Sequence, residues 1–294
     1  MTVKKIGIVT NFNIYEKASA ALSVADKLHS LCCEVLVASF NRDKINRQRL
    51  GKRDFISFIP LEKIYQEAEL IIVLGGDGTI LESARKAAPA GIPLLGINLG
   101  RLGYMAELEL DETDRLAEIV DGKYRLDRRM MIKVEVIGRD GNVKFESFAL
   151  NDAVISNGVT ARMIDLALSE GGAAITNYRA DGLIIATPTG STAYSLSAGG
   201  AVVDPRLECF CVTPICPHTL GSRPLVFQKT AVIEVKNVCQ REKVLFLTLD
   251  GRVNFEVAYN DTVRITESDM ATELVRVKDN CFYNQLRKKM NFNI

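Results

Sequence analysis

The chain has 294 residues, which is enough for two domains that each bury a core without disulfide bonds. Apolar residues make up 47% of it and charged residues 25%, an ordinary globular composition that excludes disordered, collagen-like and coiled-coil chains. The 37 basic and 36 acidic residues leave a net charge of +1, so the overall charge does not indicate a nucleic-acid partner.

The sequence predicts neither a membrane partner nor export. A membrane span needs about 18 uninterrupted apolar residues, and no stretch of the sequence comes near that length. The N-terminus lacks the apolar core of a signal peptide. The seven cysteines are scattered and do not follow the pattern of a secreted disulfide framework. We therefore expect a cytoplasmic protein with reduced thiols.

The first part of the chain alternates apolar runs with helical segments. Strands are expected at residues 6–9, 34–37, 70–74 and 93–97, with helices at 18–31 and 112–120. Continuous apolar runs separated by helices are typical of parallel strands buried on both faces. We predict an α/β domain with a parallel sheet over residues 1–125, in which the basic run 41–53 forms a loop.

The second half has a strand-rich pattern. Alternating residues at 131–137, an Asp140-Gly141 turn and a return at 143–150 predict a hairpin. Further strands are expected at 183–186, 231–235, 244–249, 253–257 and 263–265, with hardly a helix between them. This predicts a mainly-β domain over residues 126–270, followed by a segment, 271–294, whose helical, basic end packs back on the first domain.

A glycine-rich motif follows the apolar run at 70–74. It reads Gly75-Gly76-Asp77-Gly78-Thr79 and precedes the helical residues 80–88. Free backbone N–H groups and the positive end of a helix favour a phosphate at such a turn. Phosphate binding alone does not need the carboxylate of Asp77, which indicates a partner hydroxyl or divalent cation. The alternative is a tight turn in which Asp77 is only the N-cap of the helix.

The second motif is the hydroxyl-rich segment Thr187–Ser197. Seven of its eleven residues carry hydroxyl groups, which could read the polar edges and sugar hydroxyls of a ligand, and Tyr194 offers a flat face for a base. The alternative is a Ser/Thr-rich turn that leads into a closely packed helix. A Gly-x-Gly-x-x-Gly dinucleotide motif and a P-loop are both absent from the sequence, which argues against a dehydrogenase and a P-loop NTPase.

Together with Asn151-Asp152, these two motifs resemble the NAD kinase family in order and spacing. The glycine-rich motif also occurs in diacylglycerol and sphingosine kinases, whereas Thr187–Tyr194 makes the match specific. The resemblance implies the fold shared by NAD kinases and diacylglycerol kinases. It also implies transfer of the γ-phosphoryl group of ATP to the 2′-hydroxyl of the adenosine ribose of NAD, giving NADP and ADP. A divalent cation such as Mg²⁺ and a homo-oligomer, a dimer or tetramer, belong to the same expectation.

The resemblance also implies roles for individual residues. Asp77 would accept the proton of the 2′-hydroxyl, with Gly78 beside the dinucleotide phosphates. The implied dinucleotide contacts are Asn151, Asp152, Arg162, Arg179, Asp181, Thr192, Ala193, Tyr194, Ser195, Leu196 and Ser197. His218 would lie near the site, while Arg252 departs from a family position that is often glutamine.

Weaker signals have simpler interpretations. The basic clusters Arg128-Arg129 and Arg287-Lys288-Lys289 are expected to be solvated, and Cys209-Phe210-Cys211 to be a core strand rather than a metal site. Two other functions remain as alternatives. A lipid kinase would leave the hydroxyl-rich segment unexplained, and a catalytically silent dinucleotide sensor would gain little from Asp77.

Overall fold

The computed structural model describes residues 3–100, 103–157, 162–219, 221–240, 244–279 and 282–290. It divides into two compact units, one made of residues 1–128 and 272–294 and the other of residues 129–271. The chain passes from one unit to the other within β7 (Arg125–Ile137) and returns within β18 (Thr262–Arg276). Of the expected C-terminal segment 271–294, residues 280, 281 and 291–294 lie outside the described residues.

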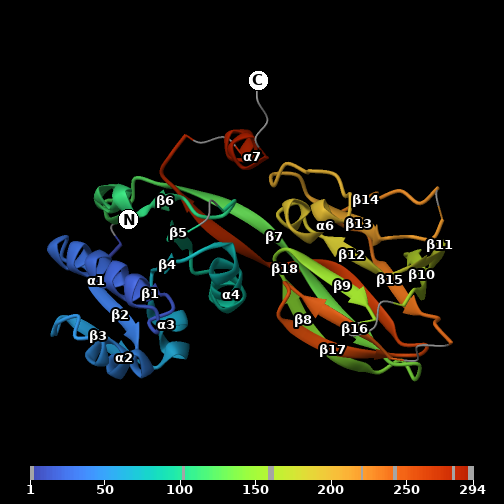
Figure 1. Cartoon of the computed structure of the whole chain (residues 1–294), viewed down its shortest axis with the longest axis horizontal. Helices are drawn as coiled ribbons and strands as arrows, with labels where there is room; N and C mark the ends of the chain where they lie inside the picture. The colour runs from blue at the N-terminus through green and yellow to red at the C-terminus, as the bar shows by residue number, and fades with distance from the viewer. Residues whose placement is uncertain are drawn as a thin grey trace. The chain divides into compact units, whose positions relative to one another are not determined.

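The first unit is built on a parallel sheet (Figure 1). Its strands lie in the order β3 (Ile56–Ile59), β2 (Glu34–Ala38), β1 (Lys5–Val9), β4 (Leu70–Leu74) and β5 (Leu94–Asn98), and β5 also pairs with β6 (Leu108–Glu109) and with Leu274 of β18. The helices are α1 (Tyr15–Ser30), α2 (Arg42–Arg47), α3 (Leu61–Glu67), α4 (Asp77–Ala87), α5 (Leu116–Val120) and α7 (Phe282–Met290).

Apolar periodicity explains these elements. Every residue of β4 is buried, as expected for a strand covered on both faces. Helix α1 places Ala18, Leu22, Ala25 and Leu28 in the core at helical spacing. The predicted parallel α/β fold is therefore confirmed.

The loop prediction for residues 41–53 is wrong, because residues 42–47 form helix α2. This helix buries a single apolar side chain, Ile45, so it carries no periodic signal that the sequence could show. Arg53, at the end of the run, is held by an ion pair with Asp26 at 2.8 Å.

The sheet order places the glycine-rich motif at a particular point. From β1 the chain continues to β2 and β3 on one side and returns to β4 on the other, so the loops after β1 and β4 diverge at the carboxyl edge. Thr10, after β1, donates its hydroxyl to the carbonyl oxygen of Leu74 at 2.8 Å, and Gly75 donates its N–H to Ile97 at 2.9 Å. Open α/β sheets bind their ligands at this kind of switch point.

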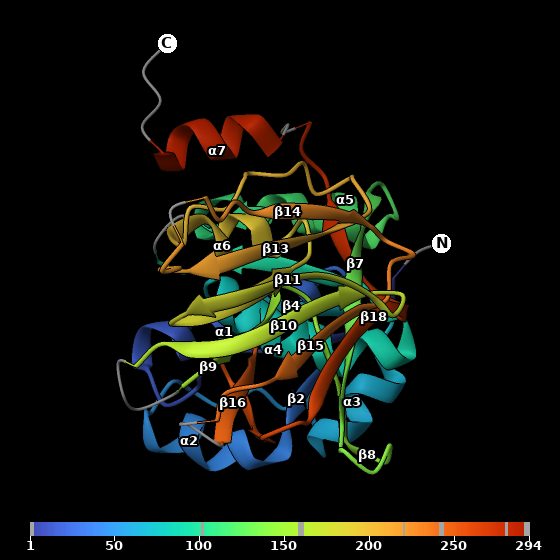
Figure 2. The same cartoon turned by 90° about the vertical axis from the view of Figure 1, so that its right-hand side faces the viewer.

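The second unit consists of two antiparallel sheets (Figure 2). In one, β11 (Ala173–Ala180), β10 (Ile164–Glu170), β15 (Ile233–Asn237) and β18 are neighbours, and β7 forms the predicted hairpin with β8 (Val143–Ala149). The other has the order β14 (Leu225–Gln228), β13 (Cys209–Ile215), β12 (Gly182–Ala186), β9 (Asp152–Ser156), β16 (Val244–Leu249) and β17 (Val253–Ala258). Both sheets contribute to one core, for example through Leu166, Ile185 and Leu247, which confirms the mainly-β prediction.

A buried glutamate fixes the chain where it re-enters the first unit after β18. Glu107 accepts the N–H groups of Val277 and Lys278 at 2.9 and 2.6 Å and pairs with Arg276 at 3.2 Å. Arg276 also pairs with Asp127 at 3.1 Å. The side chain of Glu107 is only 2% exposed, so these partners compensate the energetic cost of burying its carboxylate.

Substitution Glu107→Ala should therefore destabilise the protein by about 3–5 kcal/mol, because it removes the acceptor of the Val277 and Lys278 N–H groups and one of the two carboxylate partners of the buried Arg276. The free energy of unfolding from urea titration measures this loss. Lys52→Ala, which removes the exposed pair with Asp54, is the control and should not change the unfolding midpoint measurably. Equal effects of the two substitutions would contradict the assignment.

Candidate functional site

Asp77 lies at the start of α4, immediately after the N-cap residue Gly76. Its carboxylate does not cap the helix. Instead Oδ2 accepts the N–H of Tyr104 at 2.9 Å and Oδ1 accepts that of Met105 at 3.1 Å. The interpretation of Asp77 as a helix cap is therefore wrong, since this carboxylate holds a neighbouring loop.

The backbone of this loop lies against the Asp77 carboxylate at a glycine, Gly103. A Cβ atom at Gly103 would lie 2.2 Å from Asp77 Oδ1, well inside contact distance. The carboxylate thus packs directly on the backbone of residue 103, and its orientation is fixed. Gly78, the second residue of α4, is exposed beside it.

A lysine from the C-terminal helix faces the same carboxylate. Lys289 Nζ lies 3.9 Å from Asp77 Oδ2 and 3.8 Å from the ring centroid of Tyr104. Burial, together with the Asp77 carboxylate, raises the pKa of the Tyr104 hydroxyl. Arg287, Lys288 and Lys289 are all exposed, in agreement with the solvated-face expectation, but the sequence did not predict that Lys289 also lies beside Asp77 and Tyr104.

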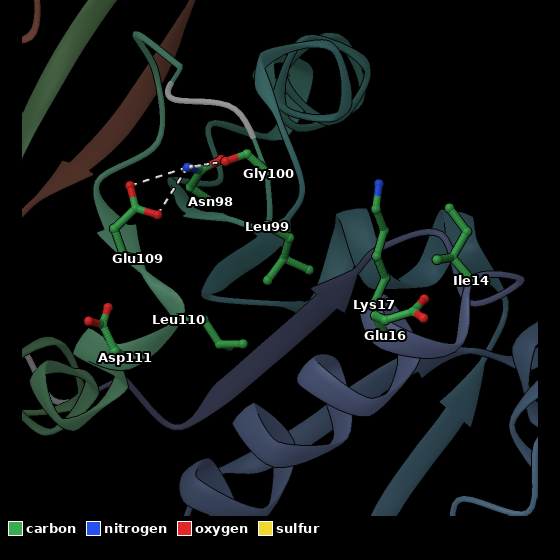
Figure 3. A pocket seen from close by; sticks show the side chains of 9 residues that line it. All are labelled: Ile14, Glu16, Lys17, Asn98, Leu99, Gly100, Glu109, Leu110 and Asp111. Carbon is green, nitrogen blue, oxygen red and sulfur yellow. Dashed lines mark hydrogen bonds between the residues drawn. The ribbon is translucent and has the colours of Figure 1, made fainter. Parts of the chain in front are cut away.

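A pocket with a volume of about 840 Å³ opens in the first unit (Figure 3). Asn98, at the end of β5, donates from Nδ2 to both Glu109 oxygens at 3.2 and 3.0 Å and to the Gly100 carbonyl at 3.2 Å. The other lining residues are Ile14, Glu16, Lys17, Leu99, Leu110 and Asp111. Asp77 is not among the lining residues, and neither is any other predicted site residue.

In the second unit, Asp250 organises the backbone around Asn151. Its carboxylate accepts the N–H groups of Leu150, Asn151 and Asp152 at 3.1, 2.8 and 3.2 Å. Asp250 itself has a left-handed backbone, with φ of 50°, in the turn between β16 and β17. Three charge-assisted hydrogen bonds hold this turn against the start of β9.

Asp152 is the first residue of β9 and is 5% exposed. Burial, and then the neighbouring Asp250 carboxylate, raises its pKa to about 7. At neutral pH this side chain is therefore protonated in much of the population and can donate a hydrogen bond. The Oδ1 atom of Asn151 is buried and has no hydrogen-bond partner among the described residues, which leaves an acceptor for a ligand.

The hydroxyl-rich segment packs directly on Asn151. Thr187 donates its hydroxyl to Leu150 O at 2.6 Å and its N–H to Asn151 O at 2.8 Å. A Cβ atom at Gly190 would lie 2.0 Å from Asn151 O, so only glycine permits this approach. A short 3-10 helix, Gly190–Thr192, and then α6 (Tyr194–Ser197) continue the segment.

Most hydroxyl groups of this segment satisfy the chain itself. Five of the seven make internal hydrogen bonds, those of Thr187, Thr189, Ser191, Thr192 and Ser195. Ser195 is fully buried and pairs with Thr213, whereas the Tyr194 side chain is 46% exposed and Ser197 is also exposed. Most of these hydroxyl groups therefore stabilise the turn. Fewer of them are left to contact a ligand than the sequence indicates.

The remaining predicted residues lie at the surface. Arg162, Arg179 and Asp181 are exposed, while Thr192, Ala193 and Leu196 are half-buried. The backbone N–H of His218 donates to the carbonyl oxygen of Arg179 at 2.8 Å. Arg129 is not solvated as expected, since it is 6% exposed and donates to Thr189 at 3.2 Å.

In the described part of the chain, the His, Cys, Asp and Glu side chains form no group of three that could hold a metal ion. No helix of these residues has both the length and the apolar character of a membrane span.

Family models match most of the chain. The ATP-NAD kinase N-terminal domain matches residues 6–124, and the ATP-NAD kinase C-terminal domain matches residues 150–277. A protein named NAD kinase from Caldanaerobacter subterraneus subsp. tengcongensis is 37% identical over 98% of this chain and 99% of its own length. Another from Geobacter metallireducens is 42% identical over 80% of this chain and 83% of its own length.

This chain belongs to the NAD kinase family. Solved structures agree with that membership. Yeast NADH kinase complexed with NADH has a TM-score of 0.88 at 25% identity, and the match covers 100% of this chain and 89% of the yeast chain. An NAD kinase from Archaeoglobus fulgidus in complex with ATP has a TM-score of 0.72 at 26% identity and covers 98% of both chains.

The raised pKa of Asp152 predicts how the stability of this NAD kinase family member changes with pH. Because the folded-state pKa of about 7 exceeds the ordinary value of 3.8, folding binds this proton more tightly. The resulting stabilisation is complete below the ordinary pKa and is lost as the pH rises through 7. Between pH 5 and pH 8 the wild type should lose about 2–3 kcal/mol relative to Asp152→Asn.

Urea titrations of both proteins at several pH values measure this difference. Asp54→Asn serves as the control, since Asp54 is exposed and its removal should leave the pH dependence of the wild type unchanged. Parallel curves for the wild type and Asp152→Asn would contradict the protonated carboxyl.

Proposed function

We propose that this chain transfers the γ-phosphoryl group of ATP to the 2′-hydroxyl of the adenosine ribose of NAD, giving NADP and ADP. Membership of the family and the names of its relatives support this reaction. The observation that carries it is the Asp77 carboxylate, which is oriented by two backbone N–H groups at the switch point of a parallel sheet.

Asp77 takes the role of proton acceptor. The 2′-hydroxyl gives its proton to the carboxylate while its oxygen attacks the γ-phosphorus, and the bond from that phosphorus to the β–γ bridging oxygen breaks. ADP leaves with the electron pair, and the carboxyl group later returns its proton to water. A weak base suffices, because the transition state of phosphoryl transfer is loose and positioning supplies most of the rate.

The geometry of Asp77 suits this role. Each carboxylate oxygen accepts one backbone N–H, which leaves further lone pairs for a ligand hydroxyl. The side chain is 26% exposed, so a substrate can reach it. Gly78 has no side chain to obstruct phosphates at the start of α4, where the helix end favours negative charge.

Dinucleotide binding is assigned to the second unit. Asn151 offers its unpaired Oδ1, Asp152 its protonated carboxyl, and the exposed Tyr194 ring a surface for the adenine. The remaining proposed contacts are Arg162, Arg179, Asp181, Thr192, Ala193, Leu196 and Ser197. Ser195 belongs to the same segment, but its hydroxyl is already paired with Thr213.

A divalent cation, Mg²⁺ by chemistry, is proposed to enter with ATP. Mg²⁺ is commonly bound by substrate phosphates with only one or two protein carboxylates, so a cluster of acidic residues is not needed. When bound, it would neutralise phosphate charge. A cytoplasmic location and a homo-oligomer of two or four subunits stay predictions of the same proposal.

Substitution Asp77→Asn should reduce turnover at least about a thousandfold, because it removes the proton acceptor. NADP formed from NAD and Mg²⁺-ATP is detected with an NADP-specific dehydrogenase. Calorimetry should show that NAD affinity stays within a few-fold, since the proposed dinucleotide contacts lie on other residues. Equal losses of turnover and binding would assign Asp77 a structural role. Binding by the wild type without turnover would indicate a dinucleotide sensor.

Substitution Tyr194→Ala should weaken NAD affinity about three- to tenfold, because the adenine loses a stacking partner. Tyr259→Ala, which removes another partly exposed tyrosine of the same unit, is the matched control and should leave affinity unchanged. If both variants bind NAD as the wild type does, the adenosine position is wrong.

A further inference from the structure

Helix α7 presents one face to the first unit. Phe282, Leu286 and Lys289 follow the spacing i, i+4 and i+7, which places them on one side of a helix. Leu286 is 9% exposed, and the Phe282 ring lies 6.5 Å from the ring of Tyr104. Lys288 points away from this face because it lies one residue, about 100°, before Lys289.

The apolar part of this face aims Lys289 at the proposed proton acceptor. Its Nζ lies 3.8 Å from the Tyr104 centroid, and the backbone N–H of Tyr104 is bonded to Asp77. The 3.9 Å separation from Asp77 Oδ2 is a charge contact but too long for a hydrogen bond. The three N–H donors of the ammonium group are therefore not committed to Asp77.

A structural ion pair does not account for this arrangement. The Lys289 side chain is 37% exposed, and a pair with that much solvent contributes little to stability. The Asp77 carboxylate already has two backbone partners that fix its orientation. The lysine therefore adds positive charge at a place where the carboxylate needs no further anchor.

The proposed reaction needs charge at this place. A carboxylate that accepts a proton stands next to an incoming phosphate chain, and the two anions repel each other. In the loose transition state, negative charge spreads over the equatorial oxygens of the transferred group and is stabilised by cations. The sequence lacks the P-loop lysine that supplies this charge in other phosphotransferases.

We propose that Lys289 is a catalytic residue that binds the γ-phosphoryl group of ATP during transfer, an inference that rests on the proposed function. Its ammonium group donates hydrogen bonds to oxygens of the transferred group and stays protonated throughout. When Asp77 takes the proton of the 2′-hydroxyl, its negative charge disappears and so does its attraction for Lys289. The lysine charge is then free to act on the phosphoryl group at the moment when that group moves.

The test compares Lys289→Met with Lys288→Met, which removes the same charge from an exposed neighbouring position outside the face that carries Lys289. Lys289→Met should lower kcat about a hundredfold, the scale of a lost transition-state contact. NAD affinity by calorimetry should stay within twofold and the melting temperature within about 1 °C, because Lys289 is partly exposed and is not one of the proposed dinucleotide contacts. Lys288→Met should retain the wild-type kcat within twofold. Lys289→Arg, which keeps the charge, should recover at least about tenfold of the loss.

Three results would overturn the inference. They are a Lys289→Met enzyme with more than half of the wild-type kcat, a loss of NAD affinity as large as the loss of rate, and a Lys289→Arg enzyme as slow as Lys289→Met. An active wild type, an inactive Asp77→Asn variant and a fully active Lys289→Met variant would refute this inference alone. A wild type without turnover would refute the proposed function as well.

Discussion

Carboxylates that accept backbone N–H groups fix loops and strand ends in each of the two units. Asp77 holds Tyr104 and Met105, Asp250 holds residues 150–152, and Glu107 holds residues 277 and 278. Each contact joins segments that are distant in the sequence. Charge-assisted bonds to two or three consecutive N–H groups fix the positions of both the backbone segment and the carboxylate.

The same chemistry separates the roles of neighbouring acids. Asp250 is stabilised as an anion by three N–H donors, whereas the adjacent Asp152 is buried beside that anion and binds a proton near neutral pH. Asp77, with fewer donors and more solvent, faces a lysine instead. The three aspartates thus differ according to their surroundings, since Asp250 is an anchor, Asp152 can donate a hydrogen bond and Asp77 is the proposed base.

The sequence predicted what depends on local patterns. Strand β4 has the predicted bounds because five consecutive apolar residues leave one interpretation, and the glycine-rich motif was found because it breaks that run. Hydrogen-bond partners were not predictable. A threonine such as Thr187 has the same appearance in sequence whether its hydroxyl meets a ligand or Leu150. The exposure of Lys289 was predicted, but its position beside Asp77 was not, because that depends on the packing of α7.

The division of the first unit between both ends of the chain affects how the protein is made. Residues 129–271 leave the ribosome as a continuous unit. In contrast, β5 cannot pair with Leu274, and Glu107 cannot bind residues 276–278, until the end of the chain has been synthesised. Synthesis proceeds at about 5–20 residues per second, so the early sheet keeps an open edge for many seconds. The interior of the chain can fold first, and the unit that begins synthesis is the last to close.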